Sequence, residues 1–315
     1  MSTGECGLGV AGRMEVTSSV NVRFYRLEKS IEPYFTALYL FDISSPDDFW
    51  MEDYLHPEWT AMRFSVGTPP TGAIGEGPLQ ERSPFVLTGP TTRALRFGLT
   101  RARIWGLGLQ PAGWARYVAG DASDYADRIV DGAAEAPFAP FAPILDLVQS
   151  HPGHPDEVAA AIDTYLTALP HAPSPHESAI LACHDASRDP DVSDVAELAR
   201  RTGLTPRSLE RLCKRYFGFP PKMVLRRQRF LRSLAHYMNS RTRSWSESLD
   251  RQYFDQAHFV RDFRSFMGMT PSEYADMPHP VIDRIIGQRL IDQGVAPPTD
   301  LPTVLRYPRA LAGEE

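Results

Sequence analysis

The sequence predicts an α+β multidomain protein. A β-barrel or sandwich with flanking helices comes first, and an all-α domain of two helix-turn-helix units joined by a long helix follows. Short β-rich runs separated by Gly and Pro fill the N-terminal third of the chain. Residues 195–274 instead carry one helical pattern twice. A length of 315 residues is enough for about two domains.

Six strands are expected in the N-terminal half, because runs rich in β-branched and aromatic residues alternate there with turn residues. We place them at 22–27, 35–41, 60–66, 84–88, 94–99 and 103–109. Helices are expected next, near residues 112–119 and 123–130. A further helix over 155–169 has an apolar face, which packs either on its own domain or against a second copy of the chain.

The first helix-turn-helix unit is expected over residues 195–221. Its opening helix has an apolar stripe, and Gly203 supplies the turn that follows. Thr205 and Pro206 suit the N-cap and the first position of a second helix. That helix places a buried face, formed by Leu209, Leu212, Cys213 and Tyr216, opposite a basic face. Cys213 is therefore expected to serve packing rather than redox chemistry.

The second unit is expected over residues 244–274, at an offset of fifty from the first. Asp255 can cap a helix whose buried face is formed by Phe259, Phe263 and Phe266. At this offset Leu209 corresponds to Phe259, and Gly218 corresponds to Gly268. The segment 222–238 has apolar residues at helical spacing, so we expect one long helix that sets the distance between the units.

The charge of the chain is distributed unevenly. The whole chain has a formal net charge of −6, whereas residues 193–275 contain 16 Lys and Arg against 8 Asp and Glu. A basic module on an acidic body suits a protein that binds duplex DNA through one part only. The sequence has no membrane-length apolar run and no convincing signal peptide, so we expect a cytoplasmic protein without a membrane partner.

The tandem pattern resembles the DNA-binding domain of the AraC/XylS family of bacterial transcription regulators. The resemblance covers residues 175–277 and rests on the runs VAELARRTGLTPRSLERLCKRYFGFPP and DQAHFVRDFR and on the Gly, Thr-Pro and Tyr that follow. The family usually has Gly where this chain has Gln252, and Ala where it has Ser248. A residue other than Gly is uncommon at positive φ, so the second unit is expected to be strained there and re-aimed or less stable. The β-rich half resembles the cupin-like sensor domains that precede such modules.

The resemblance implies a sequence-specific transcription regulator whose two reading helices enter successive major grooves, about 34 Å apart. It also implies control by a small-molecule effector or by homodimerisation through the N-terminal domain, and contact with RNA polymerase. The residues expected to contact bases are Arg207, Ser208, Glu210, Arg211, Gln256, His258 and Arg261, and those expected to hold phosphates are Lys214, Arg215, Arg226 and Arg264. Two alternatives are an enzyme whose barrel is tethered to DNA, and a non-specific architectural DNA-binding protein.

The barrel region carries no recognisable catalytic or metal-binding pattern. It has only His56, with no His pair, paired carboxylates or phosphate loop, so we expect no enzyme activity, no cofactor and no metal. Barrel interiors often hold small molecules, and the candidate lining residues for an effector are Tyr39, Arg63, Phe64 and Trp105. The alternative is that the aromatic residues are simply core. An inward-facing Arg63 needs an anionic partner, for which the effector is one candidate.

These patterns also predict the domain boundaries. They give a disordered or extended N-terminus (1–20), a sensor domain (21–150), a helical segment with a Pro-rich linker and a possible dimerisation role (151–174), the DNA-binding domain (175–277) and a C-terminal extension (278–315). In the extension one helical face carries Val281, Ile282, Ile285, Ile286 and Leu290. This helix is expected to fold back on the protein; the alternative is that it binds RNA polymerase or a second subunit.

Overall fold

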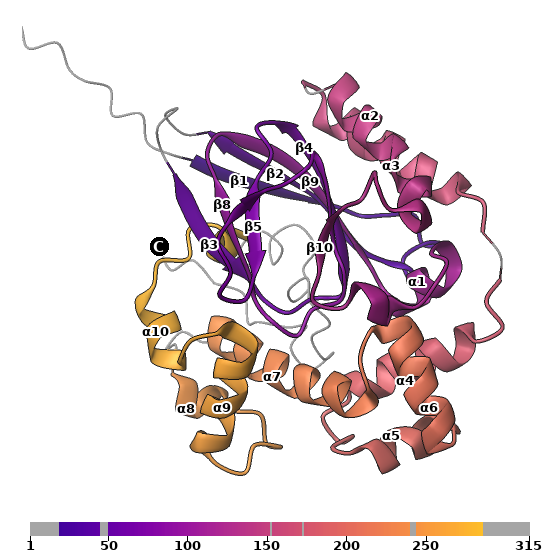
Figure 1. Ribbon diagram of the computed structural model, residues 1–315, viewed down its shortest axis with the longest axis vertical. Coiled ribbons are helices and arrows are strands. Elements are labelled where there is room, and N and C mark those ends of the chain that lie inside the picture. Colours follow the sequence, from indigo (N-terminus) through magenta and orange to yellow (C-terminus); the bar gives the residue numbers. More distant parts are fainter. Residues whose placement is uncertain (1–18, 45–49, 152, 172, 240–243, 286–315) are drawn as a thin grey trace, which may run out of the picture.

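The computed structural model describes residues 19–44, 50–151, 153–171, 173–239 and 244–285. Its N-terminal part contains a larger β-sheet of order β1-β2-β9-β4-β7-β10 and a smaller one of order β3-β8-β5-β6 (Figure 1). The strands are β1 Ser19–Tyr25, β2 Phe35–Ser44, β3 Met51–Leu55, β4 Thr60–Gly67, β5 Thr71–Ile74, β6 Gln80–Glu81, β7 Phe85–Thr88, β8 Leu95–Leu99, β9 Ala102–Leu109 and β10 Ile129–Asp131. The expected barrel or sandwich is therefore confirmed.

Strand β4 shows why both faces of the larger sheet are covered. Met62 and Phe64 belong to an apolar core that includes Ile144 of α2 (Pro143–Ser150). Ala61 and Arg63 point the opposite way, because successive side chains of a strand alternate between its faces, and they line a cavity. The strand is consequently buried along most of its length.

Two features of the N-terminal half differ from the prediction. The strands β3, β5, β6 and β10 are additional, and the last two contain only two and three residues, too few to show an alternating pattern. The helix expected near 123–130 is wrong. A 3-10 turn at Ala122–Tyr125 is followed by Asp127 with φ 52°, which ends helical geometry, and then by β10, which pairs with β7 and forms the edge of the larger sheet. Pairing with a distant strand outweighs the local helical propensity.

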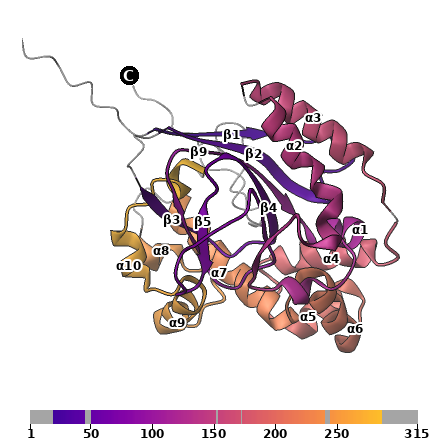
Figure 2. The same ribbon diagram turned by 45° about the horizontal axis from the view of Figure 1, so that its top comes forward.

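Three helices flank the larger sheet (Figures 1 and 2): α1 (Pro111–Tyr117), α2 and α3 (Pro155–Ala168). Val158, Ile162 and Leu166 of α3 are buried within this chain and share the core of the sheet. Of the two alternatives for this helix, packing on its own domain is therefore the one observed.

The C-terminal part is helical throughout, as expected. Its helices are α4 Glu177–Arg188, α5 Val195–Thr202, α6 Pro206–Leu212 with a π-helical turn Cys213–Phe217, α7 Pro221–Asn239, α8 Trp245–Ser248, α9 Gln256–Met267 and α10 Pro271–Asp276. The internal repeat is confirmed, because residues fifty positions apart have the same structural roles in the two units. Thr205 and Asp255 cap α6 and α9 with their side-chain oxygens. Gly218 and Gly268 end these helices with φ of 81° and 75°.

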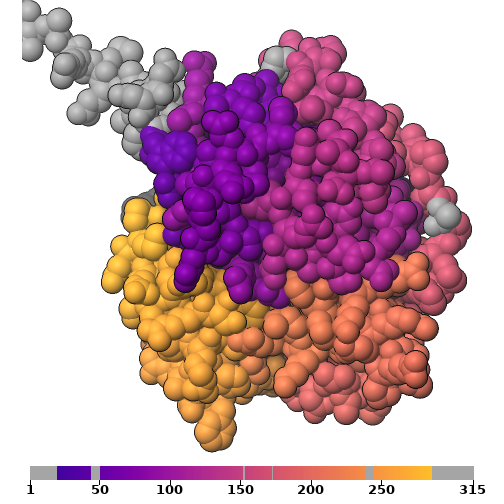
Figure 3. All heavy atoms as spheres, viewed as in Figure 1, coloured from indigo at the N-terminus to yellow at the C-terminus, as the bar shows by residue number. Residues whose placement is uncertain are grey.

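Helix α7 runs beneath the barrel, with α6 near one of its ends and α9 near the other (Figure 1). The space-filling view shows the N-terminal and C-terminal parts in contact along a continuous boundary (Figure 3). The backbone N–H of Ala94 donates to the carbonyl of Phe266, near the end of α9, at 2.7 Å. Nη1 of Arg227 on α7 donates to the carbonyl of Glu58 at 3.1 Å. The barrel is thus bonded to both the long helix and the second unit.

The chain returns to the barrel after α10. Val281, Ile282 and Ile285 are buried there, so the expected fold-back is confirmed for the described part of the extension, while Ile286 and Leu290 lie outside the described residues. Across the described ranges, no helix combines the length and the hydropathy needed to span a membrane.

Candidate DNA-reading surface and interdomain cavity

The first candidate reading helix, α6, exposes the side expected to meet DNA. Arg207, Arg211, Lys214 and Arg215 are exposed, and Ser208 and Glu210 are half-buried. Lys214 and Glu210 form an i,i+4 ion pair at 3.2 Å, and Nε of Arg215 lies 3.6 Å from Asp121 of the barrel part. Exposed pairs of this kind contribute little, so both cations remain accessible from solvent.

The second candidate reading helix, α9, likewise has one buried face and one exposed face. Phe259, Phe263 and Phe266 are buried, while Gln256, Arg261 and Arg264 are exposed. His258 is half-buried, and its ring lies 3.1 Å from Nη2 of Arg229 on α7. All seven residues expected to contact bases thus lie on α6 and α9, and His258 also contacts Arg229 of α7.

Arg226 differs from the expectation of a phosphate contact. Its Nε donates to Asp262 at 2.7 Å, and its guanidinium lies 5.0 Å from the centre of the Phe266 ring. Asp262 also accepts from Arg229 at 2.8 Å and from the Tyr253 hydroxyl at 3.0 Å. Burial alone would raise the pKa of Asp262, but the two guanidinium groups outweigh burial and hold the pKa below its ordinary value. Arg226 therefore fastens α9 to α7, and we leave it out of the phosphate set.

One exposed aromatic residue was missed in the sequence. Phe254 is 93% exposed and directly precedes Asp255, the N-cap of α9. Phenylalanine is among the residue types most often fully buried. A phenylalanine beside the start of a reading helix is suited to the methyl group of thymine in the major groove. The sequence signal for an exposed aromatic residue was the run Tyr-Phe-Asp, because only one of the two adjacent aromatic residues can point inward before the N-cap Asp255.

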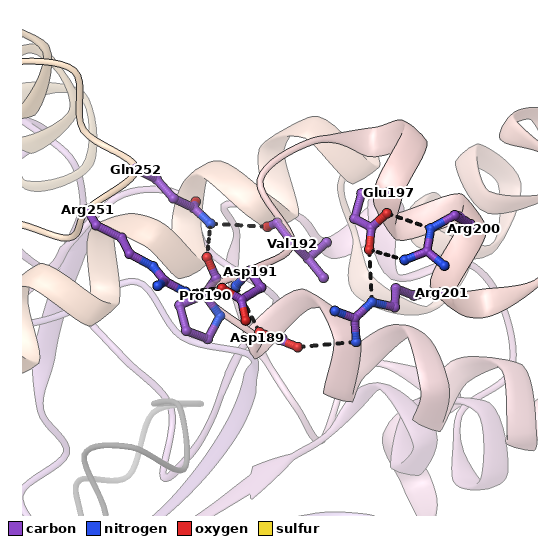
Figure 4. Close-up of polar contacts among 9 residues, drawn as sticks. All are labelled: Asp189, Pro190, Asp191, Val192, Glu197, Arg200, Arg201, Arg251 and Gln252. Atoms are coloured by element: carbon purple, nitrogen blue, oxygen red, sulfur yellow. Dashed lines mark hydrogen bonds and ion pairs between the residues drawn. The ribbon is translucent and has the colours of Figure 1, made fainter.

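Gln252 does not have the strained backbone that its position suggested. Among the described residues the one non-glycine with positive φ is Asp127, so Gln252 is accommodated without left-handed geometry. Its side-chain amide instead donates to the carbonyls of Pro190 and Val192, at 2.6 and 3.3 Å, in the loop between α4 and α5 (Figure 4). The backbone at Gln252 is therefore not strained, and its side chain instead contacts the loop between α4 and α5. Ser248, the other departure, is buried in α8, and its hydroxyl donates to the carbonyl of Ser244 at 2.7 Å.

A cavity lies between the barrel and the helical C-terminal part. It encloses about 1000 Å³ of space outside the protein atoms, its open mouth included. The barrel contributes Tyr39, Arg63 and Trp59, α7 contributes Arg227, Leu231, Leu234, Ala235 and Met238, and the C-terminal extension contributes Ile282 and Ile285. Two of the four expected lining residues are thus present. Phe64 and Trp105 face the other side of the sheet, where Phe64 stacks on Phe85 and Trp105 on Tyr25.

Arg63 already has an anionic partner, contrary to the suggestion that an effector supplies it. Its Nη2 lies 2.6 Å from Oε1 of Glu58, and its Nη1 donates to the Thr88 hydroxyl at 3.2 Å. Burial alone would lower the pKa of Arg63, but Glu58 outweighs burial and the pKa is raised. This wall of the cavity therefore holds a neutralised pair. His56 is half-buried in the same wall; burial lowers its pKa to about 4, and its Nε2 lies 2.8 Å from the Tyr274 hydroxyl of α10.

Comparison with known proteins supports the helical assignment. Residues 198–277 match the family model of a helix-turn-helix domain. A search among curated proteins gives no match. Among solved structures, the chain is similar to ToxT from Vibrio cholerae O395, with 12% identity over 82% of this chain and 96% of that one and a TM-score of 0.37. It is also similar to the AraC-like transcriptional activator CuxR, with 14% identity over 73% of this chain and 91% of that one and a TM-score of 0.26.

Proposed function

We propose that this chain, a DNA-binding transcription regulator with an AraC-type helix-turn-helix domain, reads two successive major grooves and is controlled by a small molecule bound between its two parts. The observation that carries the first half is the pair of equivalent helices, α6 and α9. Each helix begins at an N-cap residue whose side chain accepts a hydrogen bond from the backbone. One face of each helix is buried, and the other face carries exposed polar and basic residues. Two such helices at the ends of one connecting helix suit half-sites about one helical turn apart.

In this proposal α6 and α9 divide the contacts by chemistry. The residues that face base edges come from both helices. They are Arg207, Ser208, Glu210 and Arg211 of α6, Gln256, His258 and Arg261 of α9, and Phe254 directly before α9. Arg is suited to guanine because its guanidinium donates to O6 and N7 together, and Gln is suited to adenine. Lys214, Arg215 and Arg264 hold phosphates and set the register without reading sequence.

Replacing Arg211 with Ala tests the assignment. We expect specific binding to weaken by about 1–3 kcal/mol and the sequence preference to relax, because a bidentate contact to one base pair is lost. The measurement is a footprint and binding titration of the full chain on its own upstream DNA, with excess random duplex, at two salt concentrations.

Lys214→Ala is the matched control from the same helix. It should weaken binding to all sequences alike and lower the salt dependence by about one counterion, because a phosphate contact carries no sequence information. An unchanged sequence preference in Arg211→Ala would refute the base-reading role of α6.

The cavity is the proposed effector site. Its lining is largely apolar and aromatic, its charged pair Arg63–Glu58 is neutral as a whole, and the guanidinium of Arg227 lies over the Trp59 ring and donates to backbone carbonyls. We therefore propose a mostly apolar ligand. Helix α7 forms one wall of the cavity, and the opposite side of the same helix holds α9 through Arg226, Arg229 and Asp262. A ligand that shifts α7 would thus shift the second reading helix.

Filling the cavity tests its role as a binding site. Ala61 on β4 is buried in the cavity wall, so Ala61→Leu should place its extra atoms in the space that a ligand takes. With the apolar dye Nile red as the probe, we expect the full chain to enhance its fluorescence and Ala61→Leu to abolish most of that enhancement. Ala61→Ser, which is close to Ala in volume, should retain it. Equal enhancement by all three proteins would place the dye elsewhere and remove the support for this site.

A further inference from the structure

Besides being joined in sequence by α7, the second helix-turn-helix unit contacts the segment that leads into the first. Gln252 and Arg251 of the second unit meet the loop at 189–192, which directly precedes the first unit (Figure 4). Oε1 of Gln252 also accepts from Nη2 of Arg232 on α7, at 3.0 Å. One side chain therefore bonds to the first unit and to the connecting helix from its place in the second unit.

The loop that Gln252 reaches is itself fixed. The side chain of Asp189 accepts from the backbone N–H of Asp191 at 2.8 Å, and Nη1 of Arg201 on α5 lies 3.4 Å from its other oxygen. Arg201 also donates to Glu197 at 2.9 Å, and Val192 is buried in the core of the first unit. The backbone carbonyls of residues 190 and 192 are therefore held in place relative to α5, and α5 is joined to α6 by the turn at Gly203.

The other end of the bridge is equally fixed. The backbone N–H of Gln252 donates to Asp250 at 2.9 Å, and the N–H of Asp250 donates to the Ser233 hydroxyl of α7 at 2.7 Å. Asp250 is buried and pairs with Arg232, which is buried as well. The exposed Arg251–Asp191 ion pair lies alongside, and an exposed pair adds little by itself. The half-buried amide of Gln252 is therefore the main polar bridge between the loop at 189–192 and the second unit.

We infer that Gln252 is a positioning residue that braces the two units and so fixes the distance and angle between the reading helices. This inference rests on the proposed reading of two grooves. A braced reader accepts one spacing of half-sites, because one inserted base pair moves the second half-site by about 3.4 Å and rotates it around the duplex. Gln252→Gly removes all three side-chain bonds while leaving the reading helices intact, so it should relax the spacing requirement.

The first arm of the test needs no DNA. Spin labels are placed on the full chain at Lys214→Cys and Ser265→Cys, two exposed positions on the π-helical turn after α6 and on α9, in a Cys6→Ser background. Cys183 and Cys213 are buried, and burial together with their mutual contact raises the pKa of Cys213, so neither thiol competes for label. We expect one narrow distance distribution by pulsed electron paramagnetic resonance, and a broader one after Gln252→Gly.

The second arm measures spacing. The full chain and Gln252→Gly each select from a duplex library with two randomised blocks separated by spacers of varied length. We expect the unsubstituted chain to enrich one spacing and to lose about tenfold or more in affinity when one base pair is inserted. Gln252→Gly should lose about threefold or less. Ala275→Gly, which adds a glycine to the exposed side of α10, is the control and should behave as the unsubstituted chain.

The outcomes separate the two claims. Identical distance distributions and identical spacing preferences with and without the Gln252 amide would overturn the brace. Enrichment of no sequence by the unsubstituted chain would overturn the proposed reading of DNA, and the label distances would then decide on the brace alone.

Discussion

Replacing Asp262 with Ala is expected to detach the second reading helix, at a cost of about 3–5 kcal/mol in the free energy of unfolding. Asp262 lies on the inner face of α9 and is buried, and its carboxylate accepts from Arg226, Arg229 and Tyr253. Its removal leaves two guanidinium groups beside α7 with no anion. A buried charge without its partner costs far more than the ion pair itself contributes.

Urea unfolding followed by circular dichroism measures this cost. Ser265→Ala, an exposed change on the same helix, is the control and should stay within about 0.5 kcal/mol of the unsubstituted chain. Asp262→Asn, which keeps the shape but loses the charge, should fall between the two. A loss below about 1 kcal/mol in Asp262→Ala would show that the network contributes little to holding α9.

The same carboxylate predicts a response to acid. The pKa of Asp262 is lowered from its ordinary value of 3.8 in the folded chain. Its contribution is therefore fully present above about pH 4 and is lost as the pH falls through the lowered pKa. The difference in stability between the unsubstituted chain and Asp262→Asn should shrink in that acidic range.

The features predicted well from the sequence are those with a local cause. The helices α6 and α9, their caps at Thr205 and Asp255, and the glycines that end them follow from side-chain periodicity and backbone geometry within one segment. The barrel was predicted as a class, but β6 and β10 were missed because they have only two and three residues, and pairing with β5 and β7, rather than their own composition, makes them strands.

The features missed depend on partners far away in the sequence. Gln252 bonds to carbonyls 60 and 62 residues away, so the sequence suggested only strain at that position. Arg63 was correctly expected to need an anion, but Glu58 supplies it from the turn before β4. Arg226 looked like one more cation on a basic module until the fold placed Asp262 against it. Charge counts do not distinguish a cation that holds the fold from one that faces DNA.

The C-terminal extension should be released from the barrel when the pH rises. Nδ1 of His279 lies 3.1 Å from the Asp53 carboxylate, and Nε2 lies 2.8 Å from the carbonyl of Tyr274. Both partners are acceptors, so both ring nitrogens must carry a proton and the ring is cationic. Burial alone would lower the pKa of His279, but these two hydrogen bonds outweigh burial and raise it above 6.5.

The direction of the pH effect follows from that shift. A group whose pKa is raised by folding contributes stability that is fully present below its unfolded pKa, near 6.5, and is lost as the pH rises through the folded pKa. The Tm difference between the unsubstituted chain and His279→Gln should therefore be largest in mildly acidic buffer and shrink in alkaline buffer. Asp283 and His56 are the other titratable groups nearby, so His56→Gln is the control and should leave this trend in place. A difference that does not change with pH would contradict the cationic pair.

Removing the carboxylate should have the larger effect at every pH. Asp53 also accepts the backbone N–H groups of Val281 and Ile282, each at 2.9 Å, so Asp53→Ala leaves two amides and the imidazolium without an acceptor, a loss of about 3–5 kcal/mol. Ile282 and Ile285 line the interdomain cavity, so their release would open the proposed effector site. Hydrogen exchange of residues 279–285 should accelerate in Asp53→Ala while exchange in α9 stays slow. Unchanged protection of that segment would show that apolar packing alone holds it on the barrel.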